Sequence, residues 1–391
     1  MTRPPAAGRV DAALAVPAGL LAAAAAHQLG LLAAAATLGR RRHAAPGAAI
    51  RFAILIPAHD EAATIGPTLA AMEPLGAERI VVADNCTDAT AAVAAGAGAT
   101  VWERHDPERR GKGHALRWGL ERLLRERAGV EAVVVIDADC RPSANLLDAV
   151  GAAIRAGAAA VQVDYVVADA DSSPAAALRA AAFALMNHVR PRGRTALGLS
   201  AGLLGTGMAF RADLLRRVPW RSYGLAEDAE HHLRLVEAGE RVAFVPEASV
   251  RSPMPATLAA SESQQMRWEG GRLRLARRGA ALVARGLARR DPVAVQAGLD
   301  PLLPPQSVLG AGSAALAAAG AGLRLRRTAV LGSASLAMQA AYVLGGLALT
   351  RAPAAAWLAL LRAPLLVAFK LRVYARALRG GSPDEWVRTE R

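Results

Sequence analysis

Short apolar runs alternate with alanine-rich helical stretches through the middle of the chain. Each run is four or five residues long and ends in polar residues, which is typical of buried parallel strands joined by crossover helices. The order predicts an α/β domain with a mixed, mostly parallel sheet of Rossmann-like type. The predicted strands cover residues 52–56, 79–82, 132–136 and 159–163, and the predicted helices cover 62–72, 112–127, 145–156 and 229–238.

Long apolar stretches lie at both ends of the chain. Residues 12–38 carry no formal charge, and roughly 20 apolar residues suffice to span a bilayer as a helix. A secretory signal peptide is the alternative, because Arg3 and Arg9 precede the stretch. We favour a membrane anchor, since the stretch is long and ends in the arginines 40–42. The positive-inside rule keeps those arginines, and the chain that follows them, in the cytoplasm.

The C-terminal apolar region predicts further membrane helices. Residues 308–323 and 329–349 are separated by arginines and form a candidate hairpin, in which small residues allow close helix contacts. Residues 352–369 predict either another span or a helix lying in the interface. We therefore expect a multi-pass protein of the plasma membrane, with an anchor in 1–43, a cytoplasmic α/β domain in 48–290, a membrane region in 304–380 and a cytoplasmic tail in 381–391.

The charge of the chain changes the expected partner. Among 391 residues, 47 are basic and 33 acidic, a formal net charge of +14 that suggests nucleic acid. A nucleic-acid binder needs a basic stripe with stacking aromatic residues, yet aromatics make up 4% of the chain and the arginines cluster beside the apolar segments. That placement suits an anionic lipid surface. We expect a membrane partner and no nucleic acid.

Acidic residues follow three successive predicted strands, in residues 57–61, 84–90 and 137–139. The carboxyl ends of parallel strands meet at one sheet edge, where ligands bind. One such residue commonly caps the next helix, but three in succession favour a ligand site. Asp137 and Asp139 point to the same side of an extended segment, and Mg²⁺ or Mn²⁺ bridges carboxylates and phosphates. The pair predicts a metal-diphosphate site.

Three further segments contain residues that could bind a ligand or take part in catalysis. Lys112, between two glycines at a helix start, suits an anionic ligand, with a solvated loop lysine as the alternative. Asp228, at a loop-helix junction, suits a general base or a helix N-cap. Arg267 offers a fork for phosphate oxygens and Trp268 a face for a sugar ring, although an amphipathic helix packed on the membrane also explains them.

Taken in order, these motifs resemble those of family-2 glycosyltransferases with the GT-A fold, related to the membrane synthases of cellulose, hyaluronan and poly-N-acetylglucosamine. Residues 57–61 are similar to a Pro-x-x-Asn-Glu pattern, with Asp60 where Asn is usual. The remaining matches are a second nucleotide-binding stretch at 84–90, Lys-Gly-x-Ala-Leu at 112–116, Asp-x-Asp at 137–139, a Gly-Thr-Gly loop at 205–207, Glu-Asp at 227–228 and Gln-x-x-Arg-Trp at 264–268.

The resemblance implies inverting transfer of a sugar from a nucleotide-diphosphate donor, most often a UDP-sugar, to a hydroxyl of a lipid or saccharide acceptor. A processive polysaccharide synthase and a catalytically inactive scaffold are the alternatives. By resemblance, Asp228 is the catalytic base, and Asp139 with Asp137 holds Mg²⁺ or Mn²⁺. The implied donor-binding residues are Pro57, Asp60, Glu61, Asp84, Lys112, Asp137 and Arg267, and the implied acceptor-binding residues are Gly205, Thr206, Glu227, Gln264 and Trp268.

Overall fold

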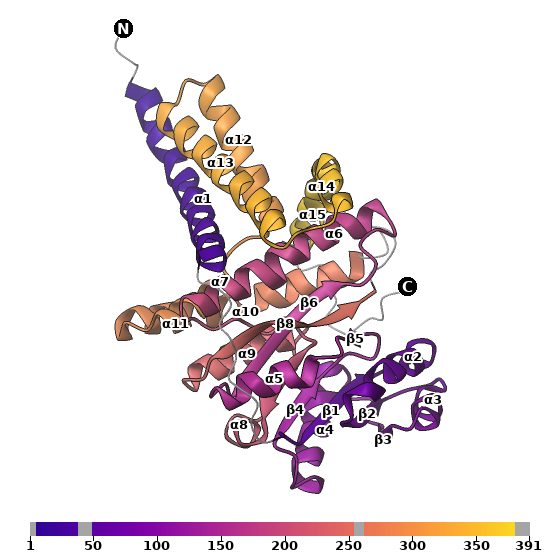
Figure 1. The fold of residues 1–391 in the computed structure, drawn as a ribbon. Helices are drawn as coiled ribbons and strands as arrows, with labels where there is room; N and C mark the ends of the chain where they lie inside the picture. The colour runs from indigo at the N-terminus through magenta and orange to yellow at the C-terminus, as the bar shows by residue number, and fades with distance from the viewer. Residues whose placement is uncertain (1–4, 38–48, 254–261, 380–391) are drawn as a thin grey trace.

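An eight-stranded sheet forms the centre of the molecule. The computed structural model describes residues 5–37, 49–253 and 262–379 (Figure 1). The strands follow the spatial order β3-β2-β1-β4-β7-β6-β8-β5. Their bounds are β1 Phe52–Ala58, β2 Glu78–Asp84, β3 Thr100–Arg104, β4 Ala132–Val135, β5 Arg141–Pro142, β6 Ala160–Val167, β7 Met208–Arg211 and β8 Val242–Ser252.

The sheet is mixed and mostly parallel, as the sequence predicts. β1 pairs in parallel with β2 and β4, β2 with β3, and β6 with β8, whereas β7 runs antiparallel to both β4 and β6. The four predicted strands correspond to β1, β2, β4 and β6. Parallel pairing therefore gathers the carboxyl ends of β1, β2 and β4 at one edge.

Both faces of the sheet are covered by helices, which explains the continuous apolar character of the strands. Along β1, Leu55 faces the side covered by α4 (Lys112–Glu126) and α8 (Ala212–Arg217). Its neighbours Ile54 and Ile56 face α2 (Ala62–Met72) and α5 (Leu146–Arg155) on the other side. Alternate side chains of a strand thus enter two separate apolar layers.

Several elements carry no sequence pattern strong enough for prediction. β5 has two residues, and β7 has four, the last of which is Arg211. Neither forms a continuous apolar run like that of β4. A helical stretch after β6 comprises α6 (Pro174–Phe183), a π-helical turn η2 (Ala184–Val189) and α7 (Arg190–Ala196). Other elements not predicted include α3 (Thr90–Gly96), η1 (Glu73–Leu75), β3, α8, β8 and α11 (Pro292–Leu299).

Three helical segments are long and apolar enough to cross a membrane: Gly8–Thr37, Arg326–Leu349 and Ala354–Leu378. The first belongs to α1 (Pro5–Thr37) and the second is α13. In Figure 1 these two helices and α12 (Gln306–Gly322) project together from one side of the α/β domain. The arginines 40–42 and the tail 381–391 lie outside the described residues.

The predicted hairpin of α12 and α13 is held by close backbone contacts and by polar side chains. A Cβ added at Gly320 would lie 2.4 Å from the backbone nitrogen of Ala329, so only glycine permits this approach. At the start of α13, Asp11 of α1 accepts hydrogen bonds from the backbone nitrogens of Arg327 (3.2 Å) and Thr328 (3.0 Å). The N-terminal end of α13 is thereby capped by another helix.

The third apolar stretch is broken into α14 (Ala354–Ala359), a 3₁₀ turn η3 (Leu360–Arg362) and α15 (Ala363–Leu378). α14 packs on α6, and α15 packs on α10 (Glu262–Arg289) of the α/β domain. Lys370 of α15 lies 3.2 Å from Glu269 of α10. Large apolar side chains on the other side are exposed, among them Leu358, Leu361 and Leu365.

Two adjacent buried histidines in α9 (Glu227–Glu237) tie the helix to the core. His231 stacks on Trp220 with ring centroids 4.2 Å apart, and neither of its ring nitrogens has a hydrogen-bond partner among the described residues. His232 shares a hydrogen bond of 2.8 Å between Nε2 and Ser200 Oγ. Burial lowers the pKa of His231 to about 3 and that of His232 to about 4, so both rings are neutral at pH 7.

These pKa shifts predict an acid-dependent loss of stability. As the pH falls below the ordinary histidine pKa of 6.5, the unfolded chain binds protons that the folded chain excludes. The free energy of unfolding then falls by about 1.4 kcal/mol per pH unit for each histidine, until the folded-state pKa is reached. His231→Phe keeps the ring stack and removes one of the two imidazoles that take up a proton on unfolding. The Tm of the detergent-solubilised protein should therefore fall less steeply between pH 7 and pH 4.5 in this variant. The exposed His105→Gln is the matched control and should leave the slope unchanged; an equal slope in His231→Phe contradicts the assignment.

Candidate active site at the sheet edge

The ammonium group of Lys112 lies at the centre of the candidate site. Its Nζ lies 2.6 Å from Asp137 Oδ1 and 3.6 Å from Glu227 Oε1, and it donates a hydrogen bond of 2.7 Å to the carbonyl of Gly205. Burial opposes the charged form, but the carboxylates of Asp137 and Glu227 outweigh it and raise the pKa of Lys112. The lysine is therefore charged and bound to protein groups, and the interpretation as a solvated loop lysine is wrong.

The glycine after this lysine allows α4 to begin so close to the segment that precedes α9. A Cβ added at Gly113 would lie 2.2 Å from the carbonyl oxygen of Ser222 and 2.9 Å from the Cα of Tyr223. No side chain fits in that space. The Lys-Gly sequence thus supplies the charge and the close backbone contact that holds it in place.

Asp137 and Asp139, which follow β4, lie close together, but residues 138–139 form a turn and not the extended segment that the sequence predicts. Their carboxylate oxygens and the sulfur of Cys140 all lie within 4.8 Å of one another. Burial raises the pKa of the Cys140 thiol, and the charge of Asp139 adds to the rise, so the sulfur stays protonated and is a poor ligand. Two carboxylates remain, which is the protein donor set that Mg²⁺ or Mn²⁺ accepts when phosphates and waters complete its shell. The residues present therefore fit such a cation.

Glu227 and Asp228 form the first turn of α9, whose N-cap residue is Ala226. The alternative that Asp228 is the N-cap is therefore wrong. Asp228 Oδ1 accepts a hydrogen bond of 2.7 Å from the backbone nitrogen of Ala229. Burial raises the pKa of both Glu227 and Asp228, while Lys112 opposes the rise. A raised pKa makes a carboxylate a stronger base.

The loop at 205–207 faces both the lysine and the candidate base. Gly205 has a φ of +84°, and a Cβ added there would lie 3.5 Å from both Asp228 Oδ2 and Lys112 Nζ. The next residue, Thr206, is fully buried and accepts a hydrogen bond of 3.1 Å at Oγ1 from the backbone nitrogen of Asp137. This loop therefore connects the carboxylates after β4 to those at the start of α9.

Gln264, Arg267 and Trp268 lie together near the start of α10. Burial lowers the pKa of Arg267, and Glu227 opposes that change, which links this helix electrostatically to the carboxylates of α9. The ring of Trp268 is half-buried, with its centroid 6.3 Å from that of Phe183. The amide oxygen of Gln264 is buried without a hydrogen-bond partner among the described residues.

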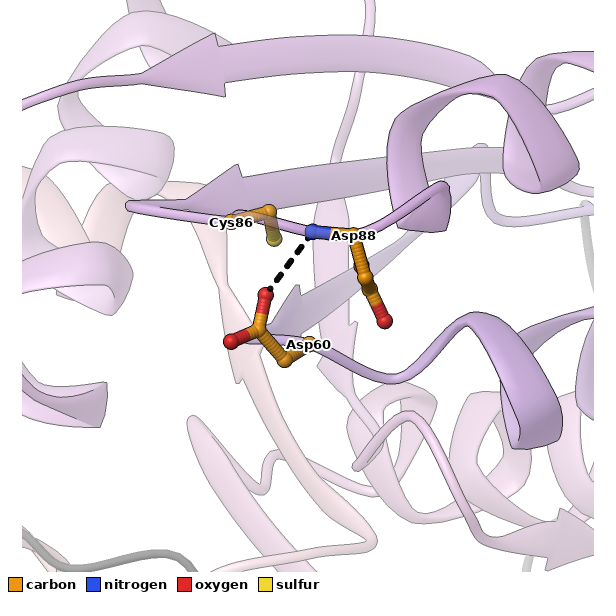
Figure 2. Close-up of side chains that lie close together, drawn as sticks. All are labelled: Asp60, Cys86 and Asp88. Atoms are coloured by element: carbon orange, nitrogen blue, oxygen red, sulfur yellow. Dashed lines mark hydrogen bonds between the residues drawn. The ribbon is translucent and has the colours of Figure 1, made fainter.

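A second group of acidic residues lies after β1 and β2. Figure 2 shows Asp60, Cys86 and Asp88, whose potential ligand atoms also lie within 4.8 Å of one another. The carboxylate of Asp60 accepts hydrogen bonds from the backbone nitrogens of Thr87 (2.6 Å) and Asp88 (3.3 Å). Burial opposes ionisation of Asp60, but these hydrogen bonds lower its pKa. Asp60 thus braces the loop after β2, and its contact with a nucleotide stays a prediction.

Pro57, Glu61 and Asp84, which are also predicted to bind the donor, lie near Asp60 and the loop after β2. Pro57 pairs with Val82 in the register of β1 and β2. Glu61 accepts a hydrogen bond of 2.6 Å from the hydroxyl of Thr64 in α2. Asp84 forms a buried ion pair with Arg104, at the end of β3, although burial still raises the pKa of Asp84. Sequence reasoning missed Arg104, whose only signal is a basic residue at the end of an apolar run.

Residues 48–271, more than half of the chain, match the sequence model of the family described as "Glycosyltransferase like family 2". The chain belongs to glycosyltransferase family 2. The match contains the carboxylates after β1, β2 and β4 together with Lys112, Asp228 and Arg267. No curated protein sequence gives a significant match.

Solved structures of glycosyltransferases are similar to this glycosyltransferase. Mannosyltransferase PcManGT from Pyrobaculum calidifontis, in complex with GDP-Man and Mn²⁺, is 21% identical with a TM-score of 0.56, and the match covers 85% of this chain and 97% of that chain. Glucosyl-3-phosphoglycerate synthase from Mycobacterium tuberculosis, in complex with Mn²⁺, UDP and phosphoglyceric acid, is 26% identical with a TM-score of 0.39, covering 59% and 75%. The likeness to the mannosyltransferase agrees with the GT-A fold expected from the motifs.

Substitution of Gly113 tests the close contact that holds Lys112. Gly113→Ala places a methyl group against the backbone of Ser222, and we expect it to lower the free energy of unfolding by about 1–3 kcal/mol, the usual cost of overpacking. The control is Gly96→Ala, because a Cβ at Gly96 meets no atom within 4 Å. Thermal unfolding measures both variants, and equal stability of the two would contradict the contact.

Proposed function

We propose that this glycosyltransferase moves a sugar from a nucleotide-diphosphate sugar to a hydroxyl of an acceptor, with inversion at the anomeric carbon. The observation that carries the proposal is the convergence of Lys112, Asp137 and the Glu227-Asp228 pair on the loop at Gly205. A positive charge that can receive a diphosphate thus lies next to a half-buried carboxylate that can accept a proton. The resemblance favours a UDP-sugar as the donor.

The carboxylates of Asp137 and Asp139 would hold Mg²⁺ or Mn²⁺ on the diphosphate of the donor. A mannosyltransferase of this fold was crystallised with GDP-Man and Mn²⁺, which supports this class of donor and cation. When bound, the cation would neutralise negative charge on the diphosphate. Metal dependence is thus part of the proposal.

Side chains of the protein perform the other steps of the proposed reaction. Asp228 accepts the proton of the acceptor hydroxyl as that oxygen attacks the anomeric carbon. Lys112 and Arg267 stabilise the nucleoside diphosphate as negative charge builds on it. Trp268 offers a face on which the acceptor sugar stacks. Asp84 and the loop braced by Asp60 bind the nucleoside.

We propose further that the enzyme works at the cytoplasmic face of the plasma membrane. α1 and α13 are long and apolar enough to serve as spans, and the shorter α12 completes a hairpin with α13 that leaves the α/β domain on one side. The broken helix pair α14–α15, which packs on α6 and α10 and exposes leucines on its other side, fits a position in the interface better than a span. So small a membrane region favours transfer of one or a few sugars to a lipid or saccharide acceptor over processive synthesis through a channel.

The base assignment is tested by Asp228→Asn, which keeps the shape of the side chain and removes its basicity. We expect sugar transfer to fall about 10²–10⁴-fold, the usual contribution of a general base, while metal-dependent nucleotide binding persists. Transfer is measured with radiolabelled donor and binding by calorimetry. The exposed Asp171→Asn is the control and should retain full transfer. Full activity of Asp228→Asn would refute the assignment.

The metal assignment is tested by the response of the full chain to a panel of nucleotide sugars with Mn²⁺. We expect one donor to raise Tm and to release nucleotide, and Asp139→Asn to lose both responses because one of two carboxylate ligands is gone. EDTA should abolish the response of the unmodified enzyme. No response to any donor would favour the inactive scaffold, and an unchanged response in Asp139→Asn would exclude it as a ligand.

A further inference from the structure

A cavity of about 160 Å³ lies beside the candidate base, on the side of the α/β domain that meets the membrane helices. It is lined by residues of η2, α7, α9, α10 and α11 and of the loop that leads to Gly205, and it is open on one side. Its lining includes Ala229, the residue after Asp228, and Leu204, the residue before Gly205. A single water needs roughly 10–15 Å³ of such space, so the cavity has room for a polyatomic group.

Positive charge predominates in the lining of this cavity. Arg190, Arg194 and Arg272 line it, and Asp300 is the carboxylate that lines it. Asp300 forms an ion pair with Arg194 and lies 3.5 Å from Arg190. Arg272 pairs with Glu269, outside the lining, and Glu269 is shared with Lys370. Burial keeps His232, which also lines the cavity, neutral by lowering its pKa to about 4. The cavity therefore suits an anion.

The arginines of the lining match the geometry of a phosphate group. The Nε atoms of Arg190, Arg194 and Arg272 are covered by protein atoms, so a ligand in the cavity would meet the outer nitrogens of these guanidinium groups. Arg190 approaches Asp300 only to 3.5 Å, which is longer than a charged hydrogen bond. The oxygens of a phosphate group match the geometry of several guanidinium groups. None of these arginines is used in the mechanism proposed above.

The cavity also lies next to the helices that contact the membrane. α7, which carries Arg190 and Arg194, packs directly on α1: a Cβ added at Gly193 would lie 2.2 Å from the carbonyl oxygen of Leu31. Just before α7, Val189 packs with Leu32 of α1 and Tyr342 of α13. Figure 1 shows α7 where α1 meets the domain. A headgroup in the cavity would thus stand between the lipid-facing helices and Asp228.

We propose that this cavity binds a phosphate group in the headgroup of the acceptor lipid and so presents a neighbouring hydroxyl of that headgroup to Asp228. The proposal rests on the proposed function for the identity of the hydroxyl, but the anion site itself needs no turnover. Arg190 and Arg272 are acceptor-binding residues here. Arg194 holds Asp300 and the carbonyl of Ala201, which fixes the wall of the cavity.

The experiment compares two lipids that differ only by the phosphate. The full chain in neutral detergent micelles is titrated with phosphatidic acid or with diacylglycerol of the same acyl chains, and Tm is recorded without donor or Mn²⁺. We expect phosphatidic acid, and not diacylglycerol, to raise Tm. Arg190→Gln and Arg272→Gln should each weaken the apparent affinity for phosphatidic acid about tenfold or more, the usual effect of losing a charged hydrogen bond. Arg192→Gln, on the same helix as Arg190 but outside the cavity lining, should not.

Two further arms make the outcome decisive. Inorganic phosphate alone distinguishes a free anion from a lipid headgroup: if it gives the whole rise in Tm and phosphatidic acid adds nothing, the lipid source is overturned. Equal responses to the two lipids, or an undiminished response in both Arg190→Gln and Arg272→Gln, overturn the site. Using two variants on different helices protects the test against misfolding of one. Binding of nucleotide sugar with Mn²⁺ should be unchanged in Arg190→Gln and Arg272→Gln. If the unmodified chain binds no nucleotide sugar, the proposed function is refuted, whereas the anion site is still tested by the lipid titration.

Discussion

The candidate site depends on one partly buried ammonium group among carboxylates. Lys112 begins α4, Asp137 follows β4, and Glu227 begins α9, so the ion pairs connect segments that are far apart in the sequence. Without that charge, Asp137, Glu227 and Asp228 would repel one another in a partly desolvated space. The same charge lies where a diphosphate would be received. The interaction that holds the site together is thus also the one that the proposed chemistry would use.

Backbone contacts make this arrangement possible. The start of α4 touches the segment before α9 at Gly113, and the loop at Gly205 adopts a positive φ that turns its carbonyl toward Lys112. Both positions exclude ordinary side chains, one by space and the other by backbone conformation. The backbone geometry thus explains why glycine occupies both positions, without any contact to substrate. Some residues of the motifs supply chemical groups, and others position those groups.

The proposed acceptor side of the domain is continuous with the apolar helices. α1 packs on α7, α13 packs on the π-helical turn η2, and α15 packs on α10, the helix that carries Arg267 and Trp268. The proposed donor side, formed by β1, β2 and β3, lies away from these helices (Figure 1). Under the proposed function, such a division would separate a water-soluble nucleotide from an acceptor that reaches the enzyme through the lipid.

The sequence by itself determined the parallel half of the sheet, because buried strands and crossover helices have local periods that can be recognised in β1, β2, β4 and α2. It also predicted that Asp137 and Asp139 lie close together, although the structure brings them together through a turn at residues 138–139 and not through the predicted extended segment. Only the tertiary structure decided the antiparallel β7, the pairing of Asp84 with Arg104, and the arginine-lined cavity. Arg194 and Asp300 are 106 residues apart, and no local pattern specifies such a pair. Distant segments meet because burial of apolar surface drives the packing of the whole chain, and the charges they carry must then be paired where they meet.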